Sequence, residues 1–177
     1  MNRKTLMLVL ILLLLLAAIP VAQAKTGRQI VGSVAFPSPA EWGVDLDLWI
    51  DFDLQEASMS NHKATGEITW RIWDEDIGWR VTRTHPSCVL FGEDVGEDPN
   101  TAIIVTRIQQ TEGWGDGLPG EYAYWWVHDN GDNDQFAVLD YSLDPWYEFF
   151  PRGKPPVCVY FEPWLKIDMG DGLEIIH

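Results

Sequence analysis

Residues 44–54 of the 177-residue chain read VDLDLWIDFDL, in which every second residue is apolar. Side chains of a β-strand point alternately to its two faces, so this stretch would bury one face and expose the other. The apolar face carries Val44, Leu46, Leu48, Ile50, Phe52 and Leu54, and the polar face carries Asp45, Asp47, Trp49, Asp51 and Asp53. The pattern predicts a half-buried strand that presents a row of carboxylates to solvent.

Short strand-like segments recur along the rest of the chain, separated by Gly, Pro, Asn and Asp. No window of a dozen residues beyond the amino-terminal segment has an apolar period of 3.6, so no α-helix is expected there. We expect further strands near residues 29–36, 68–72, 79–84, 87–91, 102–109, 121–128, 134–141, 157–161, 165–168 and 173–176. About ten short strands at this spacing predict an all-β, antiparallel fold, either a two-sheet sandwich or a flattened barrel.

Two turns connect neighbouring strands in this succession. Asp74-Glu75-Asp76-Ile77-Gly78 separates two strand-like runs, and Asp129-Asn130-Gly131 separates two more. Asn-Gly readily adopts the positive φ angles of a tight turn. We therefore expect one hairpin over residues 121–141.

The amino-terminal segment has the features of an export signal. Arg3 and Lys4 precede an apolar run from Leu6 to Ile19, and small residues occupy positions 22 and 24. This order is typical of a cleaved signal peptide, so residues 1–24 are expected to be removed and residues 25–177 to form a single secreted β domain. The apolar run is too short for a stable membrane span, and no second long run follows it. We expect a secreted, extracellular protein with no membrane attachment after signal cleavage.

Acidic residues outnumber basic ones. The chain has 12 Lys and Arg against 27 Asp and Glu, and removal of Arg3 and Lys4 leaves a formal charge of 10 − 27 = −17. This charge repels phosphate backbones and anionic lipid surfaces, which excludes nucleic acid as a routine partner. The commonest benefit of such a charge is solubility, and a cationic partner or a bound divalent ion is the alternative.

The predicted domain contains two cysteines, Cys88 and Cys158. Thiols of exported proteins are oxidised unless they are buried, so we expect a disulfide between them. A closed loop of about 70 residues would destabilise the unfolded chain by about 4 kcal/mol. Two buried free thiols are the alternative.

Tryptophan is in surplus, with ten residues in the chain. An exposed indole beside carboxylates suits a sugar, because the ring stacks on C–H faces while the acids accept hydrogen bonds from hydroxyls. Trp49, between Asp47 and Asp51, and Trp114, in the Gly-rich stretch 113–117, are the candidate ligand-binding residues on this argument. Packing in the core is the commoner use of Trp in a small β domain.

The sequence contains no motif for catalysis and no zinc-type histidine spacing, so no catalytic residue, metal site or cofactor is expected. Acidic residues 129–134 lack the register of an EF-hand, although a looser calcium site at Asp129, Asp132 and Asp134 is an alternative to a plain hairpin turn. A pair of catalytic carboxylates leaves no sequence signature. A small polysaccharide-acting hydrolase is therefore the alternative function.

Several short motifs follow one another in a recognisable order. They are Ala64-Thr65-Gly66, Cys88-Val89, residues 102–105, residues 113–117, Val127-His128-Asp129-Asn130-Gly131, Asp134-Gln135-Phe136, Cys158 and residues 170–177. Their order, over about residues 30–177, resembles a group of uncharacterised exported bacterial β-domains similar to post-COAP-1 type domains. The resemblance implies a compact secreted β domain that serves as an accessory part of extracellular proteins, and it supplies no catalytic residue.

These observations predict a non-enzymatic extracellular β domain with a binding or structural role at the cell exterior. The expected partner is an extracellular polysaccharide, contacted through exposed Trp, or another surface protein.

Overall fold

The computed structural model describes residues 27–38, 46–113, 118–140 and 158–177. The predicted signal peptide and cleavage site lie outside these ranges. The described strands are β1 (Gln29–Pro37), β2 (Asp47–Ser58), β3 (Lys63–Asp74), β4 (Gly78–Phe91), β5 (Thr101–Glu112), β6 (Tyr122–His128), β7 (Asp134–Asp140), β8 (Ile167–Gly170) and β9 (Leu173–Ile176), with a short 3₁₀ turn, η2 (Gly92–Val95), after β4.

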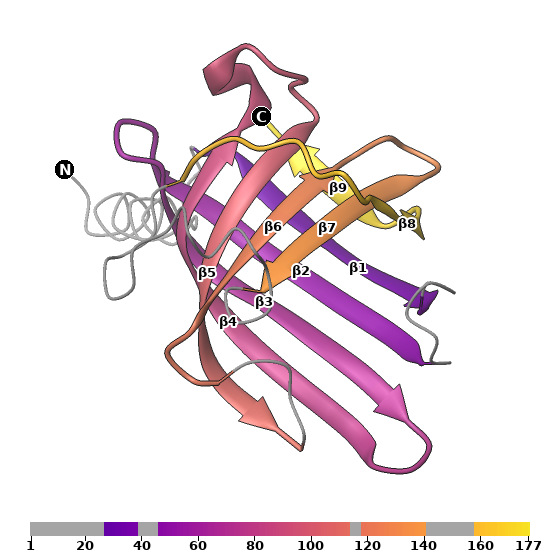
Figure 1. Ribbon diagram of the computed structural model, residues 1–177. Coiled ribbons are helices and arrows are strands. Elements are labelled where there is room, and N and C mark those ends of the chain that lie inside the picture. Colours follow the sequence, from indigo (N-terminus) through magenta and orange to yellow (C-terminus); the bar gives the residue numbers. More distant parts are fainter. Residues whose placement is uncertain (1–26, 39–45, 114–117, 141–157) are drawn as a thin grey trace, which may run out of the picture.

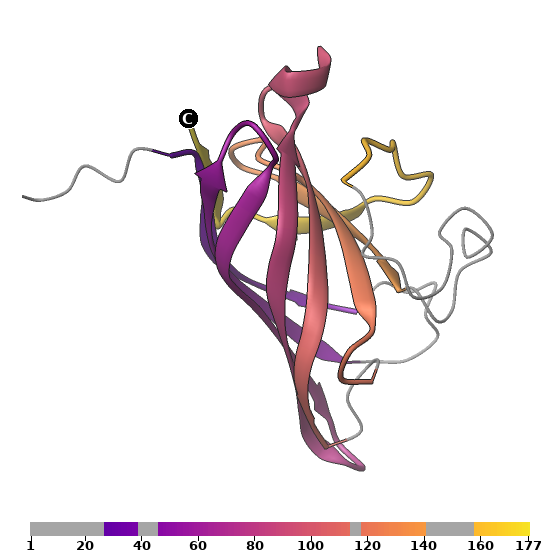
Figure 2. The ribbon, with the colours of Figure 1, turned by 90° about the vertical axis from the view of Figure 1, so that its left-hand side faces the viewer.

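The nine described strands form one antiparallel sheet in the order β8-β7-β6-β5-β4-β3-β2-β1-β9. Each strand from β1 to β7 pairs with the next strand along the chain, and the sheet curls strongly into a half-barrel (Figures 1 and 2). The predicted all-β antiparallel class is confirmed. The two-sheet sandwich is not confirmed, because the described strands all belong to one sheet.

The carboxyl-terminal segment bridges the two edges of the curled sheet. Only two residues separate β8, which pairs with β7, from β9, which pairs with β1. At this bridge Gly32 lies so close to Gly172 that a Cβ atom on Gly32 would come within 2.0 Å of the Gly172 carbonyl oxygen. Glycine at position 32 is therefore required for the approach of the last strand.

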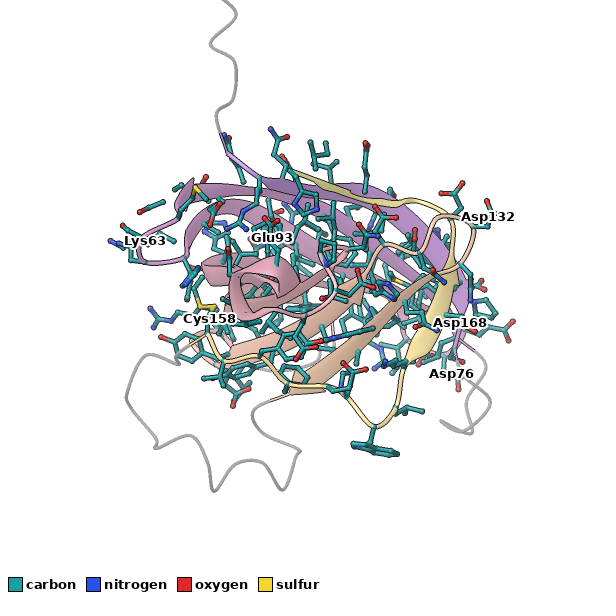
Figure 3. The ribbon with its side chains drawn as sticks, turned by 90° about the horizontal axis from the view of Figure 1, so that it is seen from above. Lys63, Asp76, Glu93, Asp132, Cys158 and Asp168 are labelled. Carbon is teal, nitrogen blue, oxygen red and sulfur yellow. A yellow bond between two sulfur atoms is a disulfide. The ribbon has the colours of Figure 1, made fainter. Side chains whose placement is uncertain are left out.

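The concave face of the sheet encloses the main core. The alternation predicted for residues 44–54 is confirmed over the described part, since Leu48, Ile50, Phe52 and Leu54 are buried. Rings from opposite sides of the curled sheet meet inside, as Phe36 of β1 and Phe136 of β7 do with centroids 5.1 Å apart. Figure 3, a view from above, shows the strands surrounding an interior filled with side chains.

A second apolar layer lies on the convex face of β4 to β7. Residues 158–166, here called the covering segment, place Cys158, Tyr160 and Phe161 against Leu90, Ile103, Trp126 and Ala137. Strand β6 is consequently buried on both faces, with Trp125 in the main core and Trp126 under the covering segment. This arrangement explains why β6 carries two successive tryptophans.

The predicted disulfide is confirmed. Cys88 at the end of β4 is bonded to Cys158, 70 residues later, with the two Cα atoms 6.1 Å apart. The bond attaches the covering segment to the sheet.

Three details of the predicted strands differ from the structure. Residues 79–84 and 87–91 belong to the single strand β4, whose pairing with β5 shifts register between Pro86 and Cys88. The prediction of a strand at 157–161 is wrong for residues 158–161, which are not in a strand. They pack their side chains over the sheet instead of pairing with an edge. The last-but-one strand begins at Ile167, two residues later than predicted.

In the ranges that the structure describes, no helix has the length and apolar character that crossing a membrane would require.

Candidate functional site

Trp49 lies on the convex face of the sheet, in the middle of the row of carboxylates that the sequence predicted. Its strand neighbours in register are Ala35 of β1 and Arg71 of β3. The side chain is half-buried. The predicted candidate is thus on the outer surface of the protein and not in the core.

Two further tryptophans lie beside Trp49. Trp73 near the end of β3 and Trp79 near the start of β4 are a cross-strand pair. The ring centroid of Trp79 is 4.9 Å from that of Trp49 and 5.3 Å from that of Trp73. Trp73 is 37% exposed and Trp79 is 49% exposed, so the three rings, here called the tryptophan row, form an aromatic surface open to solvent.

Trp73 and Trp79 were not among the candidates that the sequence suggested, although it contains a signal for their pairing. The two residues flank the predicted turn 74–78 symmetrically. Antiparallel strands that meet at a tight turn pair residues equidistant from it, so Trp73 had to face Trp79. The approach of Trp49 from a third strand had no such local signal.

Charged groups border the tryptophan row. Arg71, opposite Trp49, forms an ion pair with Asp51, and both side chains are more than a third exposed. The Asp51 carboxylate also accepts a 2.5 Å hydrogen bond from the hydroxyl of Ser33. This border offers both donors and acceptors next to the aromatic rings.

The side chain of Asp74 stabilises the turn of the hairpin that carries Trp73 and Trp79. Asp74 forms an ion pair with Arg80 and accepts hydrogen bonds from the backbone N–H groups of Asp76 and Ile77. The Arg80 guanidinium, followed by the backbone donors, lowers the pKa of Asp74 below its usual value. The turn between the two rings is therefore a defined structure, as the sequence predicted.

The other tryptophans have different environments. Trp114, the second predicted binding residue, lies outside the described residues. Trp125 and Trp126 are buried, each at 1% exposure, and Trp125 donates a 3.0 Å hydrogen bond from Nε1 to the Thr106 hydroxyl. Trp164 in the covering segment is 82% exposed. Packing thus explains Trp125 and Trp126 but not the tryptophan row.

The acidic turn 129–134 uses its carboxylates to bind backbone. Asp134 is fully buried and accepts hydrogen bonds from the N–H groups of Asn130, Gly172 and Leu173. Asp129 accepts from the N–H groups of Gly131 and Ile175. These contacts give both acids a structural role between the β6–β7 turn and the carboxyl-terminal strand.

A shallow depression of about 350 Å³ lies next to this turn, at the β1–β9 seam. Three acids line it, namely Asp129, Asp171 and Glu174.

Among the described carboxyl groups, those of Asp74, Asp94 and Glu162 have displaced pKa values, and all three are lowered. A glycosidase acid needs the opposite displacement, so these three groups are unsuited to that role.

Comparison of the chain with protein-family models, with curated proteins and with solved structures finds no match.

Proposed function

We propose that the chain is a secreted, non-enzymatic β domain that binds an extracellular polysaccharide through the tryptophan row. The observation that carries this proposal is the contact of three tryptophans from three strands on the convex face, with Trp79 between Trp49 and Trp73. The disulfide is compatible with an oxidising compartment outside the cell.

Without a ligand, the exposed rings of the tryptophan row contribute less to stability than buried rings would. Large aromatic rings that stay in water forgo the free energy of burial, and clusters of them on a surface commonly mark contact sites. Sugars suit such rings because their C–H faces stack on the indole while their hydroxyls reach polar groups nearby. Asp51 and Arg71 supply an acceptor and a donor at the border of the row.

The geometry of the rings favours a flexible polysaccharide chain over a flat crystalline surface. Neighbouring rings are tilted by 54° and 60°, so the row is curved. A flat surface would require the three rings to be coplanar, whereas a single chain can bend to follow them.

The hydrolase alternative has weaker support. It requires two carboxyl groups at a concave site, and the acids of the depression at the β1–β9 seam include Asp129, whose oxygens accept two backbone hydrogen bonds. The tryptophan row lies on a different part of the sheet, over β2 to β4.

Intrinsic tryptophan fluorescence tests the proposal. The protein is screened on a polysaccharide array, and each hit is titrated while Trp emission is recorded. We expect Trp79→Ala to weaken binding about fivefold or more, since one lost aromatic contact is worth about 1 kcal/mol or more. Trp164→Ala is the matched control because it removes an exposed Trp outside the row. Absence of any hit, or equal affinity of Trp79→Ala and wild type, would contradict the proposal.

A further inference from the structure

A buried arginine lies at the upper end of the curled sheet, among three carboxylates. Arg28, just before β1, makes two hydrogen bonds to Glu56, of 2.9 and 2.8 Å, and two of 2.8 Å to Asp94. It also donates a 2.6 Å hydrogen bond to Glu93. Its guanidinium lies 4.1 Å from the centre of the Phe91 ring. Figure 3 shows Glu93 on the η2 turn above the interior of the sheet.

The charges of this group do not balance. One guanidinium faces three carboxylates, so the formal sum is +1 − 3 = −2. The side chains of Arg28 and Glu56 are only 7% and 1% exposed. Arg28 and Glu56 compensate each other, so the excess negative charge lies on Asp94 and Glu93, which are 21% and 44% exposed. This excess charge favours a further cation beside the buried pair.

His62 approaches the same carboxylates from the β2–β3 turn. Its Nδ1 atom is buried and has no hydrogen-bond partner among the described residues. This atom lies 3.7 Å from Oδ2 of Asp94, which is too long for a hydrogen bond. The backbone of His62 has a φ of 54°, an uncommon conformation for a residue other than glycine. Lys63, the next residue along the chain, is labelled beside this end of the sheet in Figure 3.

The distances suit ligands that share one metal ion. One ligand atom from each of Glu56, His62 and Asp94 lies within 4.8 Å of the other two. Two ligands of a tetrahedral ion with bonds of about 2.0–2.2 Å are separated by about 3.4 Å. The 3.7 Å between His62 and Asp94 is close to that separation, and an oxygen of Glu56 lies within 4.8 Å of both ligand atoms.

We propose that Glu56, His62 and Asp94 bind a divalent first-row transition metal ion, for which Zn²⁺ is the natural probe. One imidazole nitrogen with two carboxylates suits this class of ion better than Ca²⁺, which prefers oxygen ligands alone. Each carboxylate oxygen has two lone pairs, so it can bind the ion while it accepts a hydrogen bond from Arg28. Arg28 then orients the ligands, as hydrogen-bonded groups around metal sites do.

The site has access to solvent and room for a further ligand. The side chains of His62 and Asp94 are 34% and 21% exposed, whereas Glu56 is buried below them. Three protein ligands leave a fourth tetrahedral position for water. A second pair of groups, Glu93 and His177 with 3.4 Å between their nearest atoms, lies next to the site and is the main competitor for the ion.

Calorimetric titration with Zn²⁺ after treatment with a chelator tests the proposal on the full mature chain. We expect one equivalent of Zn²⁺ to bind and the melting temperature to rise, because an ion that binds only the folded state stabilises it. Co²⁺ in place of Zn²⁺ provides an absorbance signal that reports the ligand set directly. Absence of a Zn²⁺-dependent rise in melting temperature would overturn the proposal.

Variants distinguish the proposed ligands from their neighbours. His62→Gly removes the imidazole at a position whose φ glycine adopts without strain, so the fold is expected to survive. We expect this variant to bind Zn²⁺ at least about tenfold more weakly than wild type. His85→Ala, which removes an exposed histidine near Glu67, is the matched control and should bind normally. Wild-type affinity in His62→Gly, or loss of binding only in His177→Ala, would also overturn the proposal.

Discussion

Asp134 and Leu173, 39 residues apart, are joined by a 2.8 Å hydrogen bond from the backbone N–H of Leu173 to the buried carboxylate. The same oxygen accepts a 3.0 Å hydrogen bond from Gly172, and the other oxygen accepts one from Asn130. A single side chain therefore connects the β6–β7 turn to the segment that bridges the two edges of the sheet.

Replacement of Asp134 by Asn should destabilise the fold by about 2 kcal/mol, because a charged acceptor is lost and an amide N–H₂ now faces backbone donors. Urea unfolding followed by circular dichroism measures the change. Asp132→Asn is the matched control, since Asp132 is an exposed acid of the same turn, labelled in Figure 3. Equal destabilisation by both substitutions would show that the buried hydrogen bonds of Asp134 are unimportant.

Removal of the Cys88–Cys158 disulfide should free the covering segment. The double variant Cys88→Ala/Cys158→Ala is expected to lose about 4 kcal/mol of stability from loop closure alone. It should also bind a hydrophobic dye more strongly, because Leu90, Ile103 and Trp126 lie under that segment. Denaturant unfolding and dye fluorescence measure the two effects. Detection of free thiols in wild-type protein unfolded without reductant would contradict the structure.

The Thr106 hydroxyl has a structural role inside the curled sheet. In Thr106→Val the buried Nε1–H group of Trp125 loses its acceptor, which should cost about 1–3 kcal/mol with little change in side-chain volume. Thr65→Val on the exposed face of β3 is the control and should change the unfolding free energy by less than about 0.5 kcal/mol. If Thr106→Val unfolds at the wild-type urea concentration, the hydrogen bond contributes nothing to stability.

Alkaline pH should weaken the attachment of the covering segment through Tyr160. Burial is the main reason why the pKa of Tyr160 lies above its usual 10.0, and the neighbouring Glu162 acts in the same direction. The unfolded chain releases this proton near pH 10.0 while the folded chain retains it, so stability present below that pH is lost as the pH rises above it.

Denaturant midpoints of wild type and Tyr160→Phe, measured between about pH 9 and pH 11, test this pH dependence. Lysine titration affects both proteins equally, so the wild type should lose more stability than the variant. Identical slopes would indicate that Tyr160 titrates in the folded protein as it does in the unfolded one.

Local patterns in the sequence predicted much of the fold. Alternation in residues 44–54 identified the buried face of β2, and the turns at 74–78 and 129–131 identified which strands are neighbours. The pairing of Cys88 with Cys158 followed from the redox chemistry expected for an exported chain. The strand predicted at 157–161 was wrong over residues 158–161, because apolar residues over a sheet and apolar residues within a sheet have similar composition.

The candidate sites were less accessible to sequence reasoning. Trp49 was identified by its place among carboxylates, but its contact with Trp79 spans two strand pairings. The cluster around Arg28 was not predicted, because its members come from separate segments of the chain. They are Arg28, Glu56, His62 and Asp94. Motifs for metal ligands describe residues at fixed spacing in the sequence. They do not describe residues that become neighbours only because the sheet curls.

The sequence by itself determined most of the strands, the inner and outer faces of β2 and two of the turns between paired strands, because side-chain alternation and turn chemistry act between residues close in the chain. Only the tertiary structure decided that the sheet curls until its last segment bridges both edges, that three tryptophans touch, and that His62 meets Glu56 and Asp94. These contacts depend on the twist and register of the whole sheet, which result from the summed packing of all its strands.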